Sequence, residues 1–329
     1  MTRKHCIYCL AVDAKLNKDH IFNDWYGGKK RVTSCEVCNT RFSKEFESIA
    51  ANEFLVPLYT ALSTVGLNFR LDLPKWRKAF KASGEEFDQI LGSDGIVRMT
   101  LSKPKVLKNS SGGIGMVLFR SEKEANEGLK RLIAKTGKTH LRIEKMPVKF
   151  KGFRQPFSYD MKQSTFLLAM KMAVALATRL PNFDPLETLL GRMTLFGEST
   201  SEKLVSETLT HMKKIDSLRP PLSHMVYVER SSGITKATVQ FFGTFKFDCK
   251  LGRPDPTVPD AAVLGWFDPI AKKESFSECS PIGLDVYNRI HDELTRVRLA
   301  ERWNERLDEE ARAAGSTKKI DLHGEIIFE

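Results

Sequence analysis

Four cysteines near the amino terminus form two pairs with the spacing of a metal site. Cys6-Ile-Tyr-Cys9 and Cys35-Glu-Val-Cys38 each place two thiols three positions apart. Two such pairs can complete the tetrahedral sulfur shell that structural zinc prefers, and a redox-active dithiol is the alternative. Cysteines and charges interrupt the amino-terminal segment, so we expect no secretory signal there, which favours a metal over disulfides. We therefore expect these four cysteines to bind structural Zn²⁺.

The segment between the two cysteine pairs carries residues suited to hydrolysis. Asp19 and His20 are expected in a strand, where adjacent side chains project to opposite faces. Asp19 can then face a metal while His20 faces an attacking water. Gly27 and Gly28 would supply a turn, and Asn39 would open a helix after the second pair. Each of these residues alone would have a structural role, but their joint placement around the cysteines indicates catalysis.

This arrangement resembles the zinc-bearing HNH (His-Me finger) endonucleases. Over residues 5–47 the chain shares their order of Cys-x-x-Cys, Asp-His, a Gly-Gly turn and Cys-x-x-Cys-Asn. It looks like the phage junction-resolving subgroup, and more closely like bacterial HNH proteins with a His-Ile-Ile-Pro, Leu-Gly-Gly and Cys-x-x-Cys-Asn-x-x-Phe-Gly signature. The corresponding segments here read His20-Ile-Phe-Asn, Trp25-Tyr-Gly-Gly and Cys35-Glu-Val-Cys-Asn-Thr-Arg-Phe-Ser.

The resemblance implies a role for each of these residues. Asp19 and Asn39 would ligate a catalytic Mg²⁺ or Mn²⁺, because a hard cation takes oxygen donors. His20 would be the general base, since an imidazole with a pKa of ~6.5 accepts a proton near neutral pH. Structural zinc, bound by the four cysteines, would lie away from this chemistry.

The chain departs from the family pattern at two positions. Phe42 occupies the place where the junction-resolving relatives carry an acidic residue, and Ser43 replaces the usual glycine. A third metal ligand would then be Glu45 or Glu47. His5 is interpreted as a flanking residue, because four thiolates already complete a zinc shell.

The charge distribution favours a polyanionic partner. The formal net charge is +11, its basic excess lies mainly in residues 51–160, and residues 251–329 are acidic. Nucleic acid fits this balance, with DNA preferred over RNA, although a merely soluble basic protein is the alternative. The expected nucleic-acid contacts in the first module are Lys18, Lys29, Lys30, Arg31 and Arg41.

The length and patterning predict an α+β protein, and the resemblance implies that a small zinc-stapled ββα-metal (HNH) module precedes an α+β body with antiparallel strands. The predicted regions are the module (1–48), a connecting helix (49–66), a basic α+β region (67–160) and a helical and antiparallel-sheet region (161–329). Predicted helices are 43–65, kinked or split at Pro57, and 121–138, 160–179, 184–196, 200–214 and 284–313. Predicted strands are 96–101, 115–120, 141–150, 224–229, 235–242, 244–250 and 322–328.

The sequence thus predicts a metal-dependent endonuclease. A zinc-stapled nucleic-acid-binding or adaptor module without catalysis, and a nuclease silent until a partner or ligand licenses it, are the alternatives. A cytoplasmic location without a membrane span is expected, and helix 284–313 could mediate a homodimer. By analogy, HNH proteins with such appended domains are similar to parts of defence, restriction or mobile-element systems.

Overall fold

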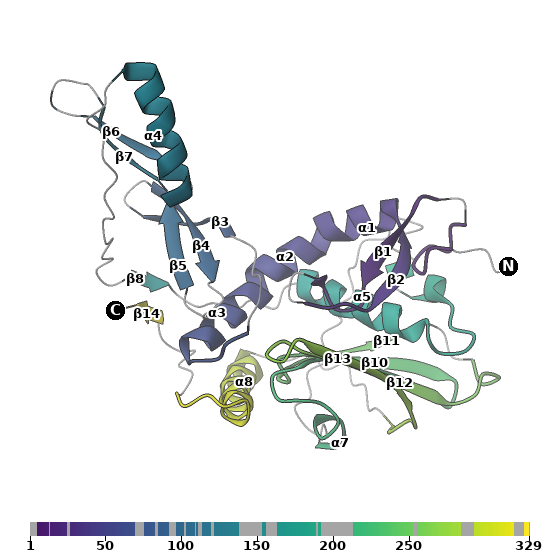
Figure 1. Cartoon of the computed structure of the whole chain (residues 1–329). Coiled ribbons are helices and arrows are strands. Elements are labelled where there is room, and N and C mark those ends of the chain that lie inside the picture. Colours follow the sequence, from purple (N-terminus) through teal and green to yellow (C-terminus); the bar gives the residue numbers. More distant parts are fainter. Residues whose placement is uncertain are drawn as a thin grey trace. The chain divides into compact units, whose positions relative to one another are not determined.

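The chain forms two compact units of mixed helices and antiparallel strands, which confirms the predicted α+β class. The first unit contains residues 1–71 and 156–325, and the second contains residues 72–155 and 326–329. Figure 1 labels their elements. The computed structural model describes residues 5–12, 14–24, 27–69, 76–82, 85–91, 97–101, 103–108, 110, 114–119, 122–137, 153–155, 163–188, 190–191, 213–252, 255–283, 293–318 and 326–328.

The first unit begins with an antiparallel hairpin followed directly by a helix. Strand β1 (Leu16–His20) pairs with β2 (Arg31–Cys35), and α1 (Glu36–Phe42) starts at the next residue. The hairpin loop turns at Gly27, whose φ is +106°. A Cβ at Gly28 would lie 1.9 Å from the Phe22 carbonyl oxygen, so the close approach of the backbone there requires glycine.

The helix that follows contains two π-helical turns. After α1 come η2 (Ser43–Glu47), α2 (Ser48–Ala50), η3 (Ala51–Leu55) and α3 (Val56–Thr64), each starting where the previous one ends. Pro57, in the first turn of α3, does not split the run as the sequence suggested. Its missing N–H instead falls directly after the wider η3 turn, where the α-helical hydrogen-bond register has already changed.

A five-stranded antiparallel sheet forms the core of this unit, in the order β11-β10-β9-β12-β13. The predicted strands 224–229, 235–242 and 244–250 are confirmed as its first three strands, which pair in sequence order. Strands β12 and β13 were not predicted, and they extend the sheet beyond β9. The strands are β9 (His224–Ser231), β10 (Ile234–Phe241), β11 (Phe245–Lys250), β12 (Ala261–Asp268) and β13 (Lys273–Cys279).

Helix α5 (Gln163–Ala177) lies between this sheet and the helix of the amino-terminal region. It contacts β9 and β10 on one side and η2 and α2 on the other. Because both sides are covered, every residue from Ser164 to Ala177 is buried, as the apolar pattern of 160–179 predicted. Phe54 of η3 also packs edge-on against Phe241 and Phe245 of the sheet.

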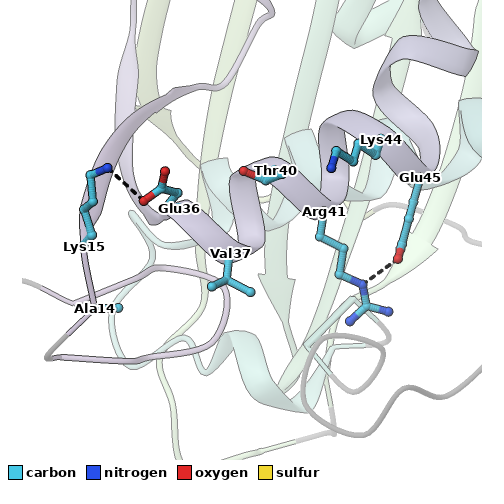
Figure 2. Close-up of a pocket in the computed structure, with 8 residues that line it drawn as sticks. All are labelled: Ala14, Lys15, Glu36, Val37, Thr40, Arg41, Lys44 and Glu45. Carbon is cyan, nitrogen blue, oxygen red and sulfur yellow. Dashed lines mark hydrogen bonds and ion pairs between the residues drawn. The ribbon is translucent and has the colours of Figure 1, made fainter.

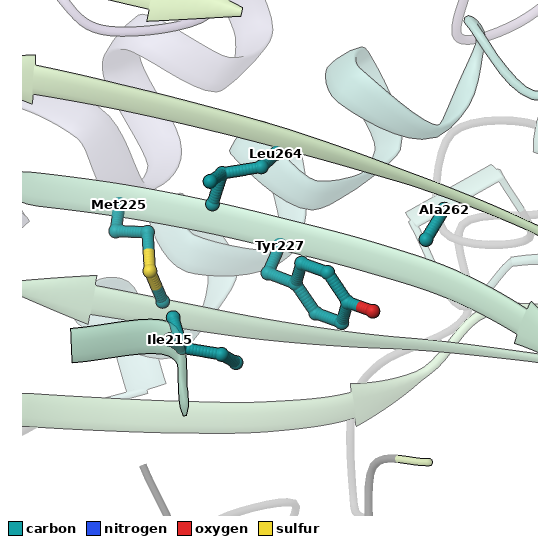
Figure 3. Packing of buried hydrophobic residues seen from close by; sticks show 5 residues of the cluster. All are labelled: Ile215, Met225, Tyr227, Ala262 and Leu264. Atoms are coloured by element: carbon teal, nitrogen blue, oxygen red, sulfur yellow. The ribbon is translucent and has the colours of Figure 1, made fainter. Parts of the chain in front are cut away.

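Two further helices pack on the sheet. Short helix α7 (Lys213–Asp216) places Ile215 against a buried cluster of sheet residues, Met225, Tyr227, Ala262 and Leu264 (Figure 3). Helix α8 (Glu293–Ala313) packs Trp303 on Phe245, with the ring centroids 5.7 Å apart. It confirms part of the predicted helix 284–313, and residues 284–292 lie outside the described part. The 3₁₀ turn η4 (Pro185–Glu187) lies in the predicted helix 184–196, of which residues 189 and 192–196 are not described. Helix α7 begins at the end of the predicted helix 200–214, of which residues 200–212 are not described.

The second unit combines small antiparallel sheets with one helix. The predicted strands 96–101 and 115–120 and the predicted helix 121–138 correspond to β5, β7 and α4. The predicted closing strand contains β14, which pairs with β8, and the predicted strand 141–150 lies outside the described residues. The elements are β3 (Trp76–Ala82), β4 (Glu85–Leu91), β5 (Val97–Leu101), β6 (Lys105–Lys108), β7 (Ile114–Leu118), α4 (Glu122–Thr136), β8 (Phe153–Gln155) and β14 (Ile326–Phe328).

Candidate metal centre and active site

The four predicted cysteines lie together at one end of the β1–β2 hairpin. The sulfur atoms of Cys6, Cys9, Cys35 and Cys38 all lie within 4.8 Å of one another. The hydrogen bond between Cys6 and Cys38 lowers the pKa of Cys6 to about 4 and raises that of Cys38, and burial raises the pKa of Cys9. A thiolate is the form that ligates metal. The cluster could therefore hold a metal ion such as zinc, as the spacing predicted.

Two local turns bring these sulfur atoms together. In the first pair, Leu10 has a φ of +57° and its N–H donates to the Cys6 carbonyl over 2.9 Å. The Ile7 N–H donates to Thr33 of β2 over 3.0 Å, which ties this turn to the hairpin. In the second pair, Cys35 caps α1, because its Sγ accepts the Cys38 N–H over 3.3 Å. One pair thus closes a turn and the other starts a helix.

Asp19 and His20 lie at the end of β1 with side chains on opposite faces of the hairpin, as strand alternation predicted. Asp19 is 5% exposed and shares its face with the buried Ser34. His20 is half-buried and lies opposite Arg31 of β2, on the face that also carries Lys18. Lys18 and Arg31 therefore make the face that carries His20 cationic, whereas the Asp19 carboxylate points into the protein.

The Asp19 carboxylate accepts three hydrogen bonds inside the protein. Its Oδ2 accepts the hydroxyl of Tyr8 over 3.2 Å. Its Oδ1 accepts the ammonium of Lys171 over 2.9 Å and the backbone N–H of His20 over 2.7 Å. Lys171 lies in the middle of α5 and is only 1% exposed, so this is a buried ion pair.

The same ammonium also pairs with Glu47, the last residue of η2. Burial lowers the pKa of Lys171, but the charges of Asp19 and Glu47 outweigh it and raise that pKa overall. Burial raises the pKa of Glu47, and Lys171 opposes this shift. One buried ammonium thus joins two carboxylates from separate elements. Glu45, the other acidic candidate, instead forms an ion pair with Arg41 over 2.8 Å.

The donor set of this cluster suits a hard divalent cation, since Asp19 and Glu47 offer the carboxylate oxygens that Mg²⁺ and Mn²⁺ take. A carboxylate has about four lone-pair sites, so Asp19 retains acceptor capacity beside its three hydrogen bonds. The position between the two carboxylates, however, is occupied by the Lys171 ammonium. Among the described residues, the four cysteines are the sole cluster of three or more His, Cys, Asp and Glu ligands.

His20 carries a nitrogen that the fold does not use. Its Nε2 is buried and has no hydrogen-bond partner among the described residues. Buried polar atoms are nearly always paired, so such an atom indicates a missing partner, such as water or substrate. Burial lowers the pKa of His20, while Asp24 opposes this shift and Arg31 adds to it.

Asn39 is half-buried on α1, and no hydrogen bond between described residues joins its side chain to Asp19 or His20. Its predicted metal-ligand role therefore stays a prediction. Of the predicted nucleic-acid contacts, four are exposed, namely Lys18, Lys29, Lys30 and Arg31. The fifth, Arg41, is half-buried in its ion pair with Glu45.

A surface pocket of about 700 Å³ lies on the outer side of α1. Figure 2 shows Val37 there, with the Lys15–Glu36 ion pair on one side and the Arg41–Glu45 pair on the other. Neither Asp19 nor His20 lines this pocket. The chemistry at the end of β1 is thus separate from it.

Sequence reasoning missed two residues of the site, Tyr8 and Lys171. Tyr8 lies between the cysteines of the first pair and had no distinguishing signal of its own. Lys171 did have one, because it is the sole charge in the apolar segment 163–177. A buried charge must be paired, so that pattern predicts an acidic partner elsewhere in the fold.

No helix among the described residues is long and apolar enough to traverse a lipid bilayer. Comparisons of the chain with models of protein families, with curated proteins and with solved structures give no match.

Proposed function

We propose that this chain is a metal-dependent HNH-type endonuclease that hydrolyses phosphodiester bonds, preferably in DNA, with His20 as its general base. The observation that carries the proposal is the unpaired, buried Nε2 of His20, next to Asp19 and on a face with Lys18 and Arg31. The order of strand, strand and helix around four clustered cysteines supports it, since this is the order expected of a ββα-metal module.

Each residue of the site has a proposed role that follows from its chemistry. His20 accepts the proton of the attacking water at Nε2, and the exposed Lys18 and Arg31 bind the phosphate backbone. Asp19 and Glu47 would hold the metal, with Asn39 as a further candidate ligand. When bound, Mg²⁺ or Mn²⁺ stabilises the charge that develops at phosphorus and on the leaving oxygen. By the family resemblance, the products carry a 5′-phosphate and a 3′-hydroxyl.

The second candidate is a zinc-stapled nucleic-acid-binding module without catalysis. One observation favours it, namely that Lys171 and Tyr8 already satisfy the Asp19 carboxylate. In that case Asp19 is a structural residue, and the cationic face of the hairpin binds nucleic acid without cutting it. The two functions differ in whether bonds are broken and in whether a divalent cation is needed.

A plasmid-nicking assay distinguishes the endonuclease from the binding module. Zinc-loaded wild type, His20→Ala and His5→Ala are each incubated with supercoiled plasmid, with and without added Mg²⁺ or Mn²⁺. Metal dependence is tested by omission rather than by a chelator, which would also strip the cysteine cluster. His5 is exposed and close in sequence to the same cysteines, so its variant controls for general damage.

We expect wild type and His5→Ala to nick the plasmid only with added metal. His20→Ala should be at least about 100-fold slower, the usual contribution of a general base, while it binds DNA as tightly in a gel-shift assay. Equal cutting by His20→Ala would remove His20 from the mechanism. No cutting by any of the three, together with salt-sensitive binding, would overturn the proposal and favour the binding module or a nuclease that a partner or ligand must license.

A further inference from the structure

Lys171 stands out because a single buried ammonium contacts two acidic residues from different elements. It lies 2.9 Å from Asp19 Oδ1 at the end of β1, and it also contacts Glu47 Oε1 at the end of η2. The Lys171 side chain is 2% exposed, that of Asp19 6% and that of Glu47 12%. The three groups therefore form a cluster nearly closed to water, with two negative charges and one positive charge.

The packing of α5 and the π turn of η2 bring Lys171 and Glu47 together. Helix α5 packs directly against η2, and a π-helical turn at η2 widens the spacing of side chains there. In a π turn, residues five positions apart lie near one another, so Glu47 is turned towards the buried side with Phe42. The negative pair thus faces the one charged residue of α5.

We propose that Lys171 is the resident counter-ion of the candidate metal site, and that a divalent cation binds Asp19 and Glu47 only by displacing its ammonium. This inference rests on the proposed function for the identity of the site. The physical basis is charge repulsion, since a divalent cation between these carboxylates would lie within contact distance of the ammonium in an environment with little water to screen it. Metal affinity is then set by a residue of α5, 152 positions from Asp19 along the chain.

The test measures Mn²⁺ binding to the zinc-loaded full chain by titration calorimetry, without any cleavage readout. Lys171→Met removes the competing charge and keeps a similar length, whereas Lys171→Arg keeps the charge. The matched control is Lys246→Met, because Lys246 is also a buried lysine paired with a carboxylate, Asp248, at 2.9 Å in the same unit.

We expect Lys171→Met to bind Mn²⁺ at least about tenfold more tightly than wild type, and Lys246→Met to bind it as wild type does. Lys171→Arg should bind no more tightly than wild type. The gain should disappear in Asp19→Asn/Lys171→Met, which lacks one of the two carboxylates. An unchanged or weaker affinity in Lys171→Met would overturn the proposal.

If Lys171→Met does not fold, wild-type protein still tests the idea. Lysine labelled with ¹⁵N allows the slowly exchanging ammonium of a buried lysine to be followed by NMR, and Lys171→Arg assigns the signal. The resonance should shift or disappear as Mg²⁺ saturates the protein, and a resonance unchanged at saturation would refute displacement. If wild type does not nick plasmid but Lys171→Met binds Mn²⁺ more tightly than wild type, only the nuclease proposal is rejected. Active nicking with unchanged Mn²⁺ affinity in Lys171→Met would reject only this inference.

Discussion

The buried charges at Lys171 predict a strongly non-additive set of substitutions. Lys171→Met leaves Asp19 and Glu47 buried without their counter-charge. The triple variant Asp19→Asn/Glu47→Gln/Lys171→Met removes all three charges and nearly preserves the side-chain volumes. We therefore expect the single substitution to be far more destabilising than the triple one.

The magnitude follows from the burial of the three groups. Removing one partner of a buried ion pair costs about 3–5 kcal/mol, because the remaining charge is desolvated without compensation. Replacing a complete buried ionic cluster by neutral groups of similar volume is often close to neutral, so we expect the triple variant within about 1 kcal/mol of wild type. For a unit of this size about 1 kcal/mol shifts the melting temperature by about 2–4 °C, so Lys171→Met should melt roughly 6–20 °C below wild type.

Differential scanning calorimetry measures these shifts on zinc-loaded protein without added Mg²⁺ or Mn²⁺. The divalent cations are left out because they could replace the missing ammonium in Lys171→Met. The transition of the first unit is identified by the fluorescence of Trp266 and Trp303, which both lie in it. A Lys171→Met variant within about 1 kcal/mol of wild type, or a triple variant less stable than Lys171→Met, would refute the counter-ion role of Lys171.

Two further predictions concern the cysteine cluster and the core. Cys38→Ser removes one of the four clustered thiols, so we expect loss of bound zinc and faster amide exchange over residues 5–38, and a wild-type zinc content would contradict the shared site. Burial lowers the pKa of His224 from 6.5 to about 3, so the unfolded chain takes up this proton first and the stabilisation present above pH 6.5 is lost as the pH falls towards 3. Between about pH 7.5 and about pH 5.5 this loss is about 1.4 kcal/mol, and urea unfolding should show it in wild type but not in His224→Gln, whereas equal pH dependence in both would count against it.

Local patterns were sufficient to predict the elements that have a clear period. Strands β10 and β11 alternate apolar and polar residues along much of their length, and turns at Gly233 and Gly243 mark the ends of β9, β10 and β11. Strand β12 is nearly continuous in apolar residues, and β13 is a polar edge strand, so neither has the alternation that identifies a half-buried strand. The place of β12 in the sheet follows from its pairing with β9, about 30 residues earlier in the chain, and β13 then pairs with β12.

In the candidate site too, some features follow from local sequence patterns and others depend on tertiary packing. The cysteine cluster follows from spacing alone, and the opposite orientation of Asp19 and His20 follows from the two-residue period of a strand. The partner of Asp19 could not be located by such rules, because Lys171 is distant in sequence and reaches it through the packing of α5 on η2. Glu47 rather than Glu45 turns inward because of a π turn, which a helical period of 3.6 does not anticipate.

The cysteine cluster and the hydrogen bonds of Asp19 hold the region around the end of β1, but neither contacts the Nε2 atom of His20. The cysteine cluster fixes the backbone at the other end of the hairpin, where Cys35 of β2 lies opposite Leu16. Lys171 and Tyr8 fix the Asp19 side chain from within the protein. His20, on the other face, has neither restraint at its Nε2. Under the proposed function, the attacking water would supply the hydrogen bond that His20 Nε2 lacks among the described residues.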